Sequence, residues 1–281
     1  MSLEAPAEAL IRVVAHALSE DLGDLGDVTT TSIVPAGTPM TGVIRSREAG
    51  RIAGVDAIRF VLSQLPEPAS ATITTADGSD VEAGGTVALL TGSARSLLTG
   101  ERVMLNLIGR LSGIATSTAA VVREVEGTGV AIKDTRKTTP GLRILEKYAV
   151  ACGGGVNHRS GLYDAILIKD NHIGVAGSIT AAVGRVRSNL GRTFPVQVEV
   201  DTLEQLEEAL DCNVTSVLLD NMKTDQLRQA VRTVNRRCHT EASGGVTPAN
   251  VRAVAETGVD SISLGWLTHS ARSLDLGLDI D

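Results

Sequence analysis

Aromatic side chains are scarce in this sequence of 281 residues, which contains two Phe, two Tyr and one Trp. The core must therefore be built from Leu, Val, Ile and Ala, as is typical of proteins with buried parallel sheets. The formal net charge is −7 at pH 7. Nucleic-acid-binding surfaces use basic stripes and stacked rings, so this composition argues against that class of protein.

Cysteine is also rare, and long apolar runs are missing. The three cysteines, Cys152, Cys212 and Cys238, lie far apart and have no CxxC spacing, which predicts free thiols in a reducing compartment. No apolar run reaches transmembrane length, and the N-terminus lacks the apolar segment of a signal peptide. We therefore expect a cytoplasmic protein.

The first part of the chain alternates between helix and strand periodicity. Residues 5–20 have helical spacing, and 21–30 form a Gly/Asp-rich turn. Residues 40–91 contain short strand-like runs around a helix at 54–65, which predicts a small antiparallel sheet with a helix laid over it. A long helical stretch then covers 96–127, with Gly109 and Gly113 as breaks or close-packing points.

After Gly127, short apolar runs alternate with helices, which predicts a parallel sheet. Each run ends in a polar or small group, and we interpret these groups as pointing to one rim. Because barrels collect site residues from many strand ends, a β/α barrel fits better than an open sheet. The roughly 155 residues available are fewer than the roughly 250 of a full barrel, so we expect six or seven strands. The runs are 130–134, 164–170, 195–200, 216–220, 240–244 and 261–265.

Positive charge is concentrated between Lys133 and His172. This stretch holds seven Lys or Arg residues against four acids, in a protein that is acidic overall. By count alone, a solvated charged face is the more common explanation. The cations, however, follow apolar strands rather than one helix face, which predicts a concave site for a small, highly charged anion.

Two glycine-containing strand ends predict a phosphate site. Ser243-Gly244-Gly245 precedes a helix whose start is indicated by Thr247 and Pro248, and Leu264-Gly265 repeats the arrangement one unit later. Glycine lets backbone N–H groups approach an anion closely, and the last loops of a barrel commonly bind phosphate.

The remaining rim groups suit an anionic substrate that carries a sugar. We find no metal-binding motif, because Glu199 and Asp220 are single carboxylates. They are suited to hold sugar hydroxyls, or to approach Mg²⁺ that arrives bound to a substrate's phosphates. The cations that would bind carboxylates are Arg136, Lys137, His158, Arg159 and Lys169.

Ordered motifs along nearly the whole chain resemble quinolinate phosphoribosyltransferase. They include EDLGDLGDVTT, ERVMLNLIGRLSGIAT, DTRKTTPGLR, GGGVNHRSGLYDAILIKDNH, EASGG and the closing LTHS. The resemblance implies an N-terminal α+β sandwich-like domain over 1–112 and an incomplete α/β barrel over 113–270. The tail 271–281 is expected to return to the first domain. It also implies a homodimer in which the N-terminal domain of one subunit covers the barrel mouth of the other.

The resemblance also implies a reaction and its site residues. Quinolinate would react with 5-phosphoribosyl 1-pyrophosphate and Mg²⁺ to give nicotinate mononucleotide, pyrophosphate and CO₂. Lys137, Glu199 and Asp220 would be catalytic, with Lys137 at the pyrophosphate and the two carboxylates at the ribose. The quinolinate carboxylates would be bound by Arg136, Arg159 and Lys169, with Thr135 and His158 beside them and Arg102 supplied by the neighbouring subunit. The 5-phosphate would be bound by Ser243, Gly244, Gly245, Leu264, Gly265 and Trp266.

Other functions are compatible with parts of this pattern. Trp266 stands where the family usually has a small residue, which changes the shape of the predicted phosphate site. A related phosphoribosyltransferase of the molybdenum-locus type, or one acting on another pyridine carboxylate, would keep the fold. Lys169 at a strand end also suits a Schiff-base aldolase. A non-catalytic sensor of sugar phosphates is the third alternative.

Overall fold

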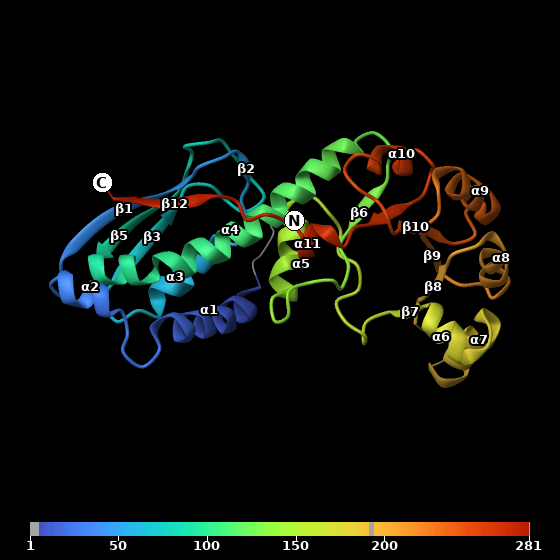
Figure 1. Ribbon diagram of the computed structural model, residues 1–281, viewed down its shortest axis with the longest axis horizontal. Coiled ribbons are helices and arrows are strands. Elements are labelled where there is room, and N and C mark those ends of the chain that lie inside the picture. Colours follow the sequence, from blue (N-terminus) through green and yellow to red (C-terminus); the bar gives the residue numbers. More distant parts are fainter. Residues whose placement is uncertain (1–5, 191–193, 281) are drawn as a thin grey trace. The chain divides into compact units, whose positions relative to one another are not determined.

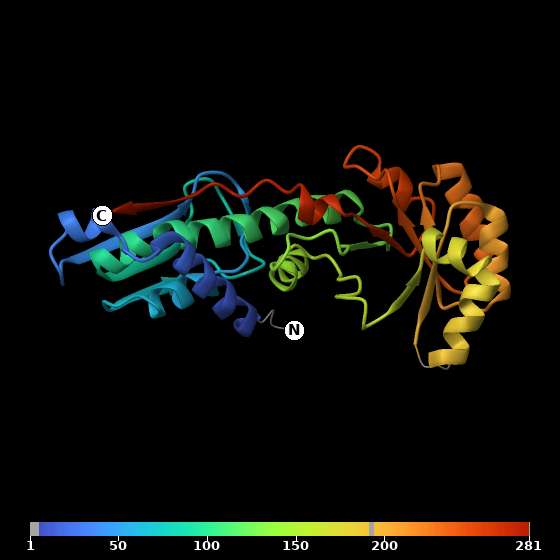
Figure 2. The same ribbon diagram turned by 60° about the horizontal axis from the view of Figure 1, so that its bottom comes forward.

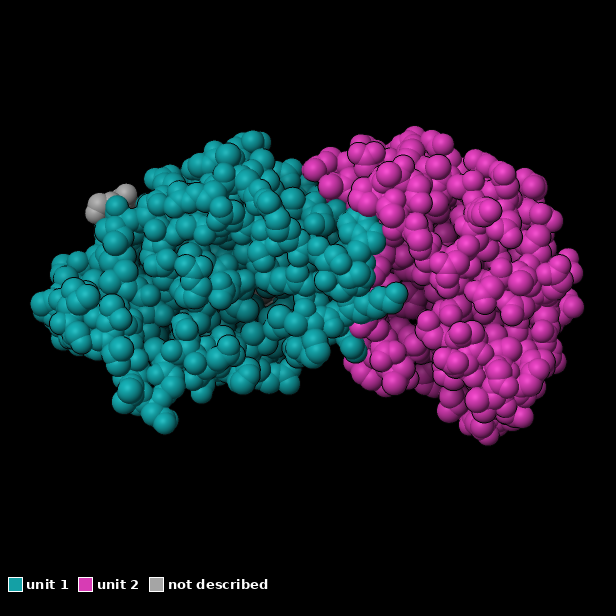
Figure 3. Space-filling view, viewed as in Figure 1, with its two compact units in different colours: residues 1–119, 137–155, 266–281 teal, residues 120–136, 156–265 magenta. Residues whose placement is uncertain are grey.

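The protein is described by a computed structural model that covers residues 6–190 and 194–280. The chain forms two compact units, coloured separately in Figure 3. Unit 1 comprises Met1–Ala119, Lys137–Gly155 and Trp266–Asp281, and unit 2 comprises Ala120–Arg136 and Val156–Gly265. These bounds differ from the expected 1–112 and 113–270, because residues 113–119, 137–155 and 266–270 belong to unit 1.

The sheet of unit 1 has the strand order β12-β1-β5-β3 and is antiparallel. Its last strand comes from the C-terminal end of the chain and pairs with β1, with Gly42 opposite Ile280. A second, two-stranded sheet joins β2 to β4, and β4 was not predicted. The strands are β1 (Pro39–Ser46), β2 (Gly50–Arg51), β3 (Ala69–Ile73), β4 (Asp80–Val81), β5 (Thr86–Ser93) and β12 (Leu276–Ile280).

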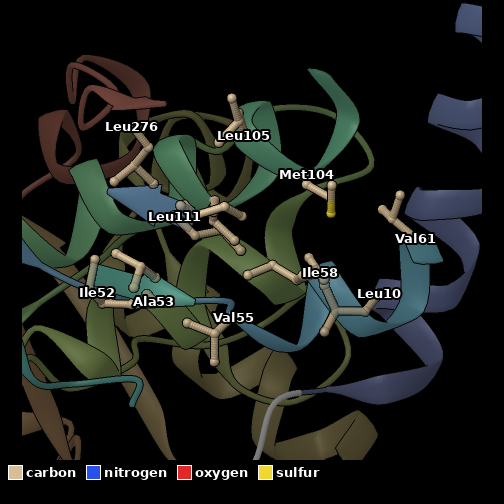
Figure 4. Close-up of a cluster of buried hydrophobic side chains, with 14 of the residues drawn as sticks. Leu10, Ile52, Ala53, Val55, Ile58, Val61, Met104, Leu105, Leu111 and Leu276 are labelled. Atoms are coloured by element: carbon tan, nitrogen blue, oxygen red, sulfur yellow. The ribbon is translucent and has the colours of Figure 1, made fainter. Parts of the chain in front are cut away.

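Helices cover this sheet and supply much of the core. Figure 4 shows Leu10, Ile58, Met104, Leu111 and Leu276 in the cluster of buried side chains. Among the described residues of this buried cluster, Tyr148 is the one aromatic side chain, which agrees with the shortage of aromatics in the sequence. The helices are α1 (Ala7–Leu22), α2 (Val28–Ile33), α3 (Asp56–Ser63), α4 (Ala94–Glu124), α5 (Arg143–Cys152) and α11 (Trp266–His269).

Helices α2 and α5 were not predicted, and both have local causes. Asp27 caps α2 by accepting a hydrogen bond from the backbone N–H of Thr30 at 2.8 Å. Helix α5 buries Leu145, Tyr148 and Cys152 in the core of unit 1. This burial explains why residues 137–155 belong to unit 1.

The long helix α4 is unbroken, so Gly109 and Gly113 are close-packing points. A Cβ atom at Gly109 would lie 3.0 Å from the carbonyl oxygen of Leu274, and one at Gly113 would overlap the carbonyl of Arg272. By length and composition α4 could cross a membrane, but 67% of its most apolar window is buried inside the protein. A core helix of a globular protein has these properties.

Unit 2 is an incomplete barrel of six parallel strands in the order β6-β11-β10-β9-β8-β7. This agrees with the predicted β/α fold. Among the described residues, the two edge strands β6 and β7 are not paired with each other. The strands are β6 (Ala131–Lys133), β7 (Ile166–Ile168), β8 (Val196–Val200), β9 (Ser216–Asp220), β10 (His239–Ser243) and β11 (Ser261–Ser263).

The helices of unit 2 lie along one side of this sheet (Figures 1 and 2). Helix α10 begins at Val251, later than the predicted start at Thr247 and Pro248, because residues 248–250 form a turn. In that turn, the side chain of Asn250 accepts a hydrogen bond from the backbone N–H of Thr247 at 2.8 Å. The helices are α6 (Asp170–Ala176), α7 (Ile179–Leu190), α8 (Leu203–Asp211), α9 (Thr224–Val234) and α10 (Val251–Ala255).

Candidate active site

Two of the predicted residues form an ion pair at the carboxyl-terminal edge of the parallel sheet. Glu199 is the fourth residue of β8, and Lys169 directly follows β7. The Lys169 Nζ atom lies 2.7 Å from Glu199 Oε2. The lysine side chain is 45% exposed, so its ammonium remains accessible to a second anion. A Schiff-base lysine needs an uncharged, desolvated amine, and this ion pair provides the opposite surroundings.

The next two strands bring Asp220 and the Ser243-Gly244-Gly245 loop together. Asp220 ends β9, is directly opposite Ser243 at the end of β10, and accepts a hydrogen bond from Asn221 Nδ2 at 2.7 Å. The backbone N–H of Asn221 donates to the Ser243 carbonyl at 2.9 Å. Gly244 has φ +79°, and a Cβ there would overlap the Asn221 side chain, so this position requires glycine.

The second predicted phosphate loop follows β11. Leu264 is buried, and its backbone N–H donates to the Lys133 carbonyl at 2.9 Å. Gly265 is the last residue of unit 2, and Trp266 begins α11 in unit 1. Helix α11 has four residues, so the loop itself, rather than a helix terminus, is the feature available for an anion.

The cations Arg136 and Arg159 both belong to unit 2 and lie near each other. Burial, and then the neighbouring charge of Arg136, lower the pKa of the Arg159 guanidinium. Arg159 Nη1 donates to the Ala165 carbonyl at 3.0 Å. Thr135 directly precedes Arg136, after the end of β6, and is half-buried. Two nearby guanidiniums favour a ligand with more than one negative charge.

The other two predicted cations belong to unit 1. Lys137 has an exposed side chain, and its carbonyl accepts a hydrogen bond from Thr268 Oγ1 at 2.7 Å. Arg102 lies on α4, where it lines a surface hollow of about 650 Å³ together with Arg47 and Arg272. Both residues are assigned to unit 1.

The interior of unit 2 contains a polar network that sequence reasoning missed. It consists of Lys133, His158, Gln197, His239, Glu241 and Ser261, and we call it the interior network.

Glu241 is the buried acid of this network. Its Oε2 lies 2.9 Å from Lys133 Nζ, and its Oε1 lies 3.2 Å from His158 Nε2. Burial raises the pKa of Glu241, but the contacts with His158 and Lys133 outweigh it and lower the pKa to about 2. The carboxylate is therefore ionised at neutral pH.

Lys133 and Asp134 were expected at the rim, and that expectation was wrong. The Lys133 ammonium contacts Glu241 and lies 3.4 Å from Nε2 of His239, the first residue of β10. Asp134 is fully buried and accepts a hydrogen bond from the backbone N–H of His158 at 2.8 Å. The sequence contained one signal of the interior network, which is a charged residue, Glu241, in the middle of the short strand β10.

A hollow of about 620 Å³ in unit 2 is lined in part by the interior network. Its lining includes Pro195, Thr215 and His239, which lie at the amino-terminal ends of β8, β9 and β10. Of the predicted site residues it contains His158 and Arg159. Glu199, Asp220 and Ser243 lie at the opposite ends of these strands.

Two family models match most of the chain. Residues 27–112 match the sequence model of the quinolinate phosphoribosyl transferase N-terminal domain, and residues 114–279 match that of its C-terminal domain. The chain belongs to the quinolinate phosphoribosyl transferase family. The first match ends at residue 112 and the second begins at residue 114.

Relatives of this quinolinate phosphoribosyl transferase family member cover nearly its full length. It is 46% identical to nicotinate-nucleotide pyrophosphorylase [carboxylating] of Mycobacterium leprae over 95% of both chains. It is 44% identical to the probable enzyme of that name from Bacillus subtilis, over 96% of this chain and 93% of the relative. The family resemblance inferred from the motifs is therefore confirmed.

Solved structures show the same fold. The nicotinate-nucleotide pyrophosphorylase of Ehrlichia chaffeensis has a TM-score of 0.93 at 43% identity, covering 99% of both chains. The enzyme of that name from Francisella tularensis has a TM-score of 0.94 at 37% identity, covering 99% of this chain and 98% of the other. Human nicotinic acid phosphoribosyltransferase, at 14% identity and a TM-score of 0.62, shares the fold alone.

Proposed function

We propose that this protein transfers the phosphoribosyl group of 5-phosphoribosyl 1-pyrophosphate to quinolinate and releases CO₂, forming nicotinate mononucleotide. Its closely similar relatives are named carboxylating nicotinate-nucleotide pyrophosphorylases. The observation that carries the proposal is that one edge of the unit 2 sheet combines Lys169, the carboxylates Glu199 and Asp220, and the Ser243-Gly244-Gly245 loop. A dicarboxylate, a ribose and a phosphate would together use all three kinds of group.

In this proposal the two substrates bind to different groups of residues. The quinolinate carboxylates are bound by Arg136, Arg159 and Lys169, with Thr135 beside them. Because Lys169 already contacts Glu199, its ammonium would be shared between that acid and a substrate carboxylate. This arrangement holds the quinolinate close to the ribose-binding acid.

The sugar phosphate would occupy the adjacent strand ends. Glu199 and Asp220 accept hydrogen bonds from the ribose hydroxyls, while Lys137 neutralises the pyrophosphate, which arrives with Mg²⁺. The 5-phosphate is bound by two loops, Ser243-Gly244-Gly245 and Leu264-Gly265-Trp266. The positive φ of Gly244 and Gly245 supports this role, because consecutive N–H groups in such a loop are able to converge on an anion.

The reaction needs no covalent intermediate with the protein. The bond between ribose C1 and pyrophosphate breaks, and the C1 that develops positive charge lies near Glu199 and Asp220, which stabilise it. The pyridine nitrogen attacks C1. Its positive charge then draws the electron pair of the C–carboxylate bond into the ring as CO₂ leaves, and a proton takes the place of the carboxylate.

Release of CO₂ from labelled quinolinate distinguishes this function from related ones. With Mg²⁺ and 5-phosphoribosyl 1-pyrophosphate, the wild-type protein should release labelled CO₂ in step with nicotinate mononucleotide. Nicotinate offered as the acceptor should give no product. Mononucleotide made from nicotinate, without CO₂ release from quinolinate, would refute the proposal.

We also propose a homodimer with shared sites, in a reducing cytoplasm. Arg102 lies on unit 1 among other arginines, in a surface hollow, which supports a role toward a second subunit. The free cysteines Cys152, Cys212 and Cys238 are compatible with a reducing compartment.

A further inference from the structure

The ring of His158 is held by hydrogen bonds on both sides. Nδ1 accepts a hydrogen bond from the backbone N–H of Arg159 at 2.7 Å, so Nδ1 carries a lone pair rather than a proton. The ring proton therefore resides on Nε2, which lies 3.1 Å from Gln197 Oε1 and 3.2 Å from Glu241 Oε1. The Gln197 oxygen accepts the hydrogen bond from Nε2–H, whereas Glu241 Oε1 is buried beside the ring without a hydrogen bond from any described residue.

The orientation of Gln197 agrees with this assignment. Its Nε2 donates to Ser216 Oγ at 3.2 Å and to Glu241 Oε2 at 3.3 Å. A carboxylate only accepts hydrogen bonds, so the amide nitrogen must face Glu241 and the amide oxygen must face His158. The donors and acceptors around His158 therefore match only when Nε2 is protonated.

Glu241 is held in turn by Lys133. The Glu241 side chain has no exposed surface, and Lys133 Nζ donates to its Oε2 at 2.9 Å. Ser261 Oγ lies 3.5 Å from the same oxygen. A buried charge is strongly destabilising without a partner, so the pair persists only as a unit.

The same histidine fixes the segment that carries Arg159. Between α5 and β7 the chain has no helix, and Val156 forms an isolated bridge to Lys133. The backbone N–H of His158 donates to the buried Asp134 at 2.8 Å, and its ring accepts from the N–H of Arg159. The position of the Arg159 backbone therefore depends on His158. The orientation of that ring depends on Gln197, whose amide is in turn oriented by Glu241.

We propose that Glu241, supported by Lys133, is a positioning residue that sets Arg159 through His158, and that His158 is itself a positioning residue rather than a direct ligand of a substrate carboxylate. The proposal rests on the proposed function, because Arg159 is one of the cations assigned to quinolinate. It gives a structural role to Lys133, His158 and Glu241, which take no other part in the proposed reaction.

The tautomer of His158 is measurable in the unmodified protein. Nitrogen NMR of histidine-labelled protein, with the His158 signals assigned by their loss in His158→Gln, should show a neutral ring protonated at Nε2. Saturating quinolinate should leave that tautomer unchanged, since the ring does not contact the substrate. A ring protonated at Nδ1, or one that becomes doubly protonated when quinolinate binds, would overturn the proposal.

Steady-state kinetics of Glu241→Gln distinguish a positioning role from a general loss of structure. We expect the KM for quinolinate to rise about tenfold or more, as when a hydrogen bond to a charged group is lost, with the KM for 5-phosphoribosyl 1-pyrophosphate little changed. Glu256→Gln is the matched control, because it removes an exposed carboxylate of unit 2 that pairs with Arg252. Equal changes in both KM values, or no change in either, would contradict positioning.

A double variant covers the case in which Glu241→Gln does not fold. Replacing both members of a buried ion pair by apolar side chains of similar size is often neutral for stability. Lys133→Met with Glu241→Met should therefore fold and still show the raised quinolinate KM. A wild-type KM in a folded double variant would overturn the proposal.

Failure of the proposed function would be recognised separately. A wild-type protein that releases no CO₂ from quinolinate refutes the function, whereas the NMR measurement requires no turnover. An active enzyme with the wrong His158 tautomer refutes only the positioning network.

Discussion

At the scale of single residues, the two glycines of the Ser243-Gly244-Gly245 loop differ in the space around them. Gly244 combines a left-handed backbone with direct contact to Asn221, while its neighbour Gly245 has the same backbone region and open space around it. Substitutions at Gly244 and Gly245 therefore distinguish the effect of backbone strain from the effect of steric overlap.

Gly244→Ala and Gly245→Ala should differ in effect. Each places a Cβ at positive φ, which costs on the order of 1–3 kcal/mol of folding free energy. Gly244→Ala must also move Asn221, which contacts Asp220, so it should lower kcat/KM for 5-phosphoribosyl 1-pyrophosphate about tenfold more than Gly245→Ala does. Urea unfolding and steady-state kinetics on both variants test this, and equal losses of activity would contradict it.

Glu241 should give the protein a recognisable acid response. Its pKa is about 2 in the folded protein and 4.5 when unperturbed, so its contribution to stability is present above pH 4.5 and is lost as the pH falls toward 2. Glu241→Gln removes this contribution, at a cost of about 3–5 kcal/mol for breaking a buried pair.

The measurement is the free energy of unfolding of both proteins from pH 5 to pH 3. The wild type should lose stability with a steeper slope than Glu241→Gln, because only the wild type takes up a proton at this site on unfolding. Parallel slopes would show that Glu241 is not a buried, charged partner of Lys133 and His158.

The sequence could place Lys169, Glu199 and Asp220 at the sheet edge, because each lies at or near the end of an apolar run, and that pattern is local. The interior network was not predictable, because Glu241 meets Lys133 across 108 residues of chain. Strand order and register bring them together, and sequence periodicity specifies neither.

At the scale of elements, close helix packing explains why α4 carries glycine at two positions. The backbone of residues 272–274 lies against the helix there, and a methyl group would overlap it. Helix α7 carries Gly184, where a Cβ meets nothing within 4 Å. The same substitution should therefore have opposite effects in the two helices.

Gly113→Ala should destabilise the protein by about 2 kcal/mol or more, because it forces the helix and the carbonyl of Arg272 apart. Gly184→Ala should instead stabilise it by roughly 0.5–1 kcal/mol through helix propensity. Denaturant unfolding of both variants tests this, and a stabilising Gly113→Ala would show that the helix is not closely packed at that position.

Element prediction succeeded where periodicity was strong. The six runs predicted as parallel strands correspond to β6 to β11, and helices α1, α3 and α4 match the predicted helices 5–20, 54–65 and 96–127 to within three residues at either end. It failed for α2 and β4, which are short, and for α5, where charged residues interrupt the apolar pattern. Glu146 on α5 is fully buried and pairs with Arg110 at 2.8 Å, so its polarity in the sequence was misleading.

At the scale of the whole molecule, the proposed shared site predicts complementation between inactive subunits. Arg102→Ala and Glu199→Ala should each have little activity alone. In a verified mixed dimer, one of the two active sites contains both substitutions and the other contains neither. Roughly half of the wild-type activity per dimer should therefore return. A mixed dimer of Glu199→Ala with Asp220→Ala is the matched control.

The control pair should remain inactive, because each of its sites keeps one altered carboxylate. Activity in both mixed dimers would indicate subunit exchange or intrinsic residual turnover. A lack of activity in the mixed dimer of Arg102→Ala and Glu199→Ala would contradict a site built from two subunits.

Strand β12 has a consequence for how the protein is made. Residues 276–280 occupy the edge of a sheet whose other strands lie between residues 39 and 93. Arg47 and Asp279, 232 positions apart, share two hydrogen bonds across that edge. During synthesis the ribosome therefore releases β1, β3 and β5 long before β12 has been made. Unit 1 begins to emerge first but is completed only when the C-terminal strand is available. Until then β1 offers an unpaired edge to any other extended segment, which makes C-terminal truncation a route to aggregation.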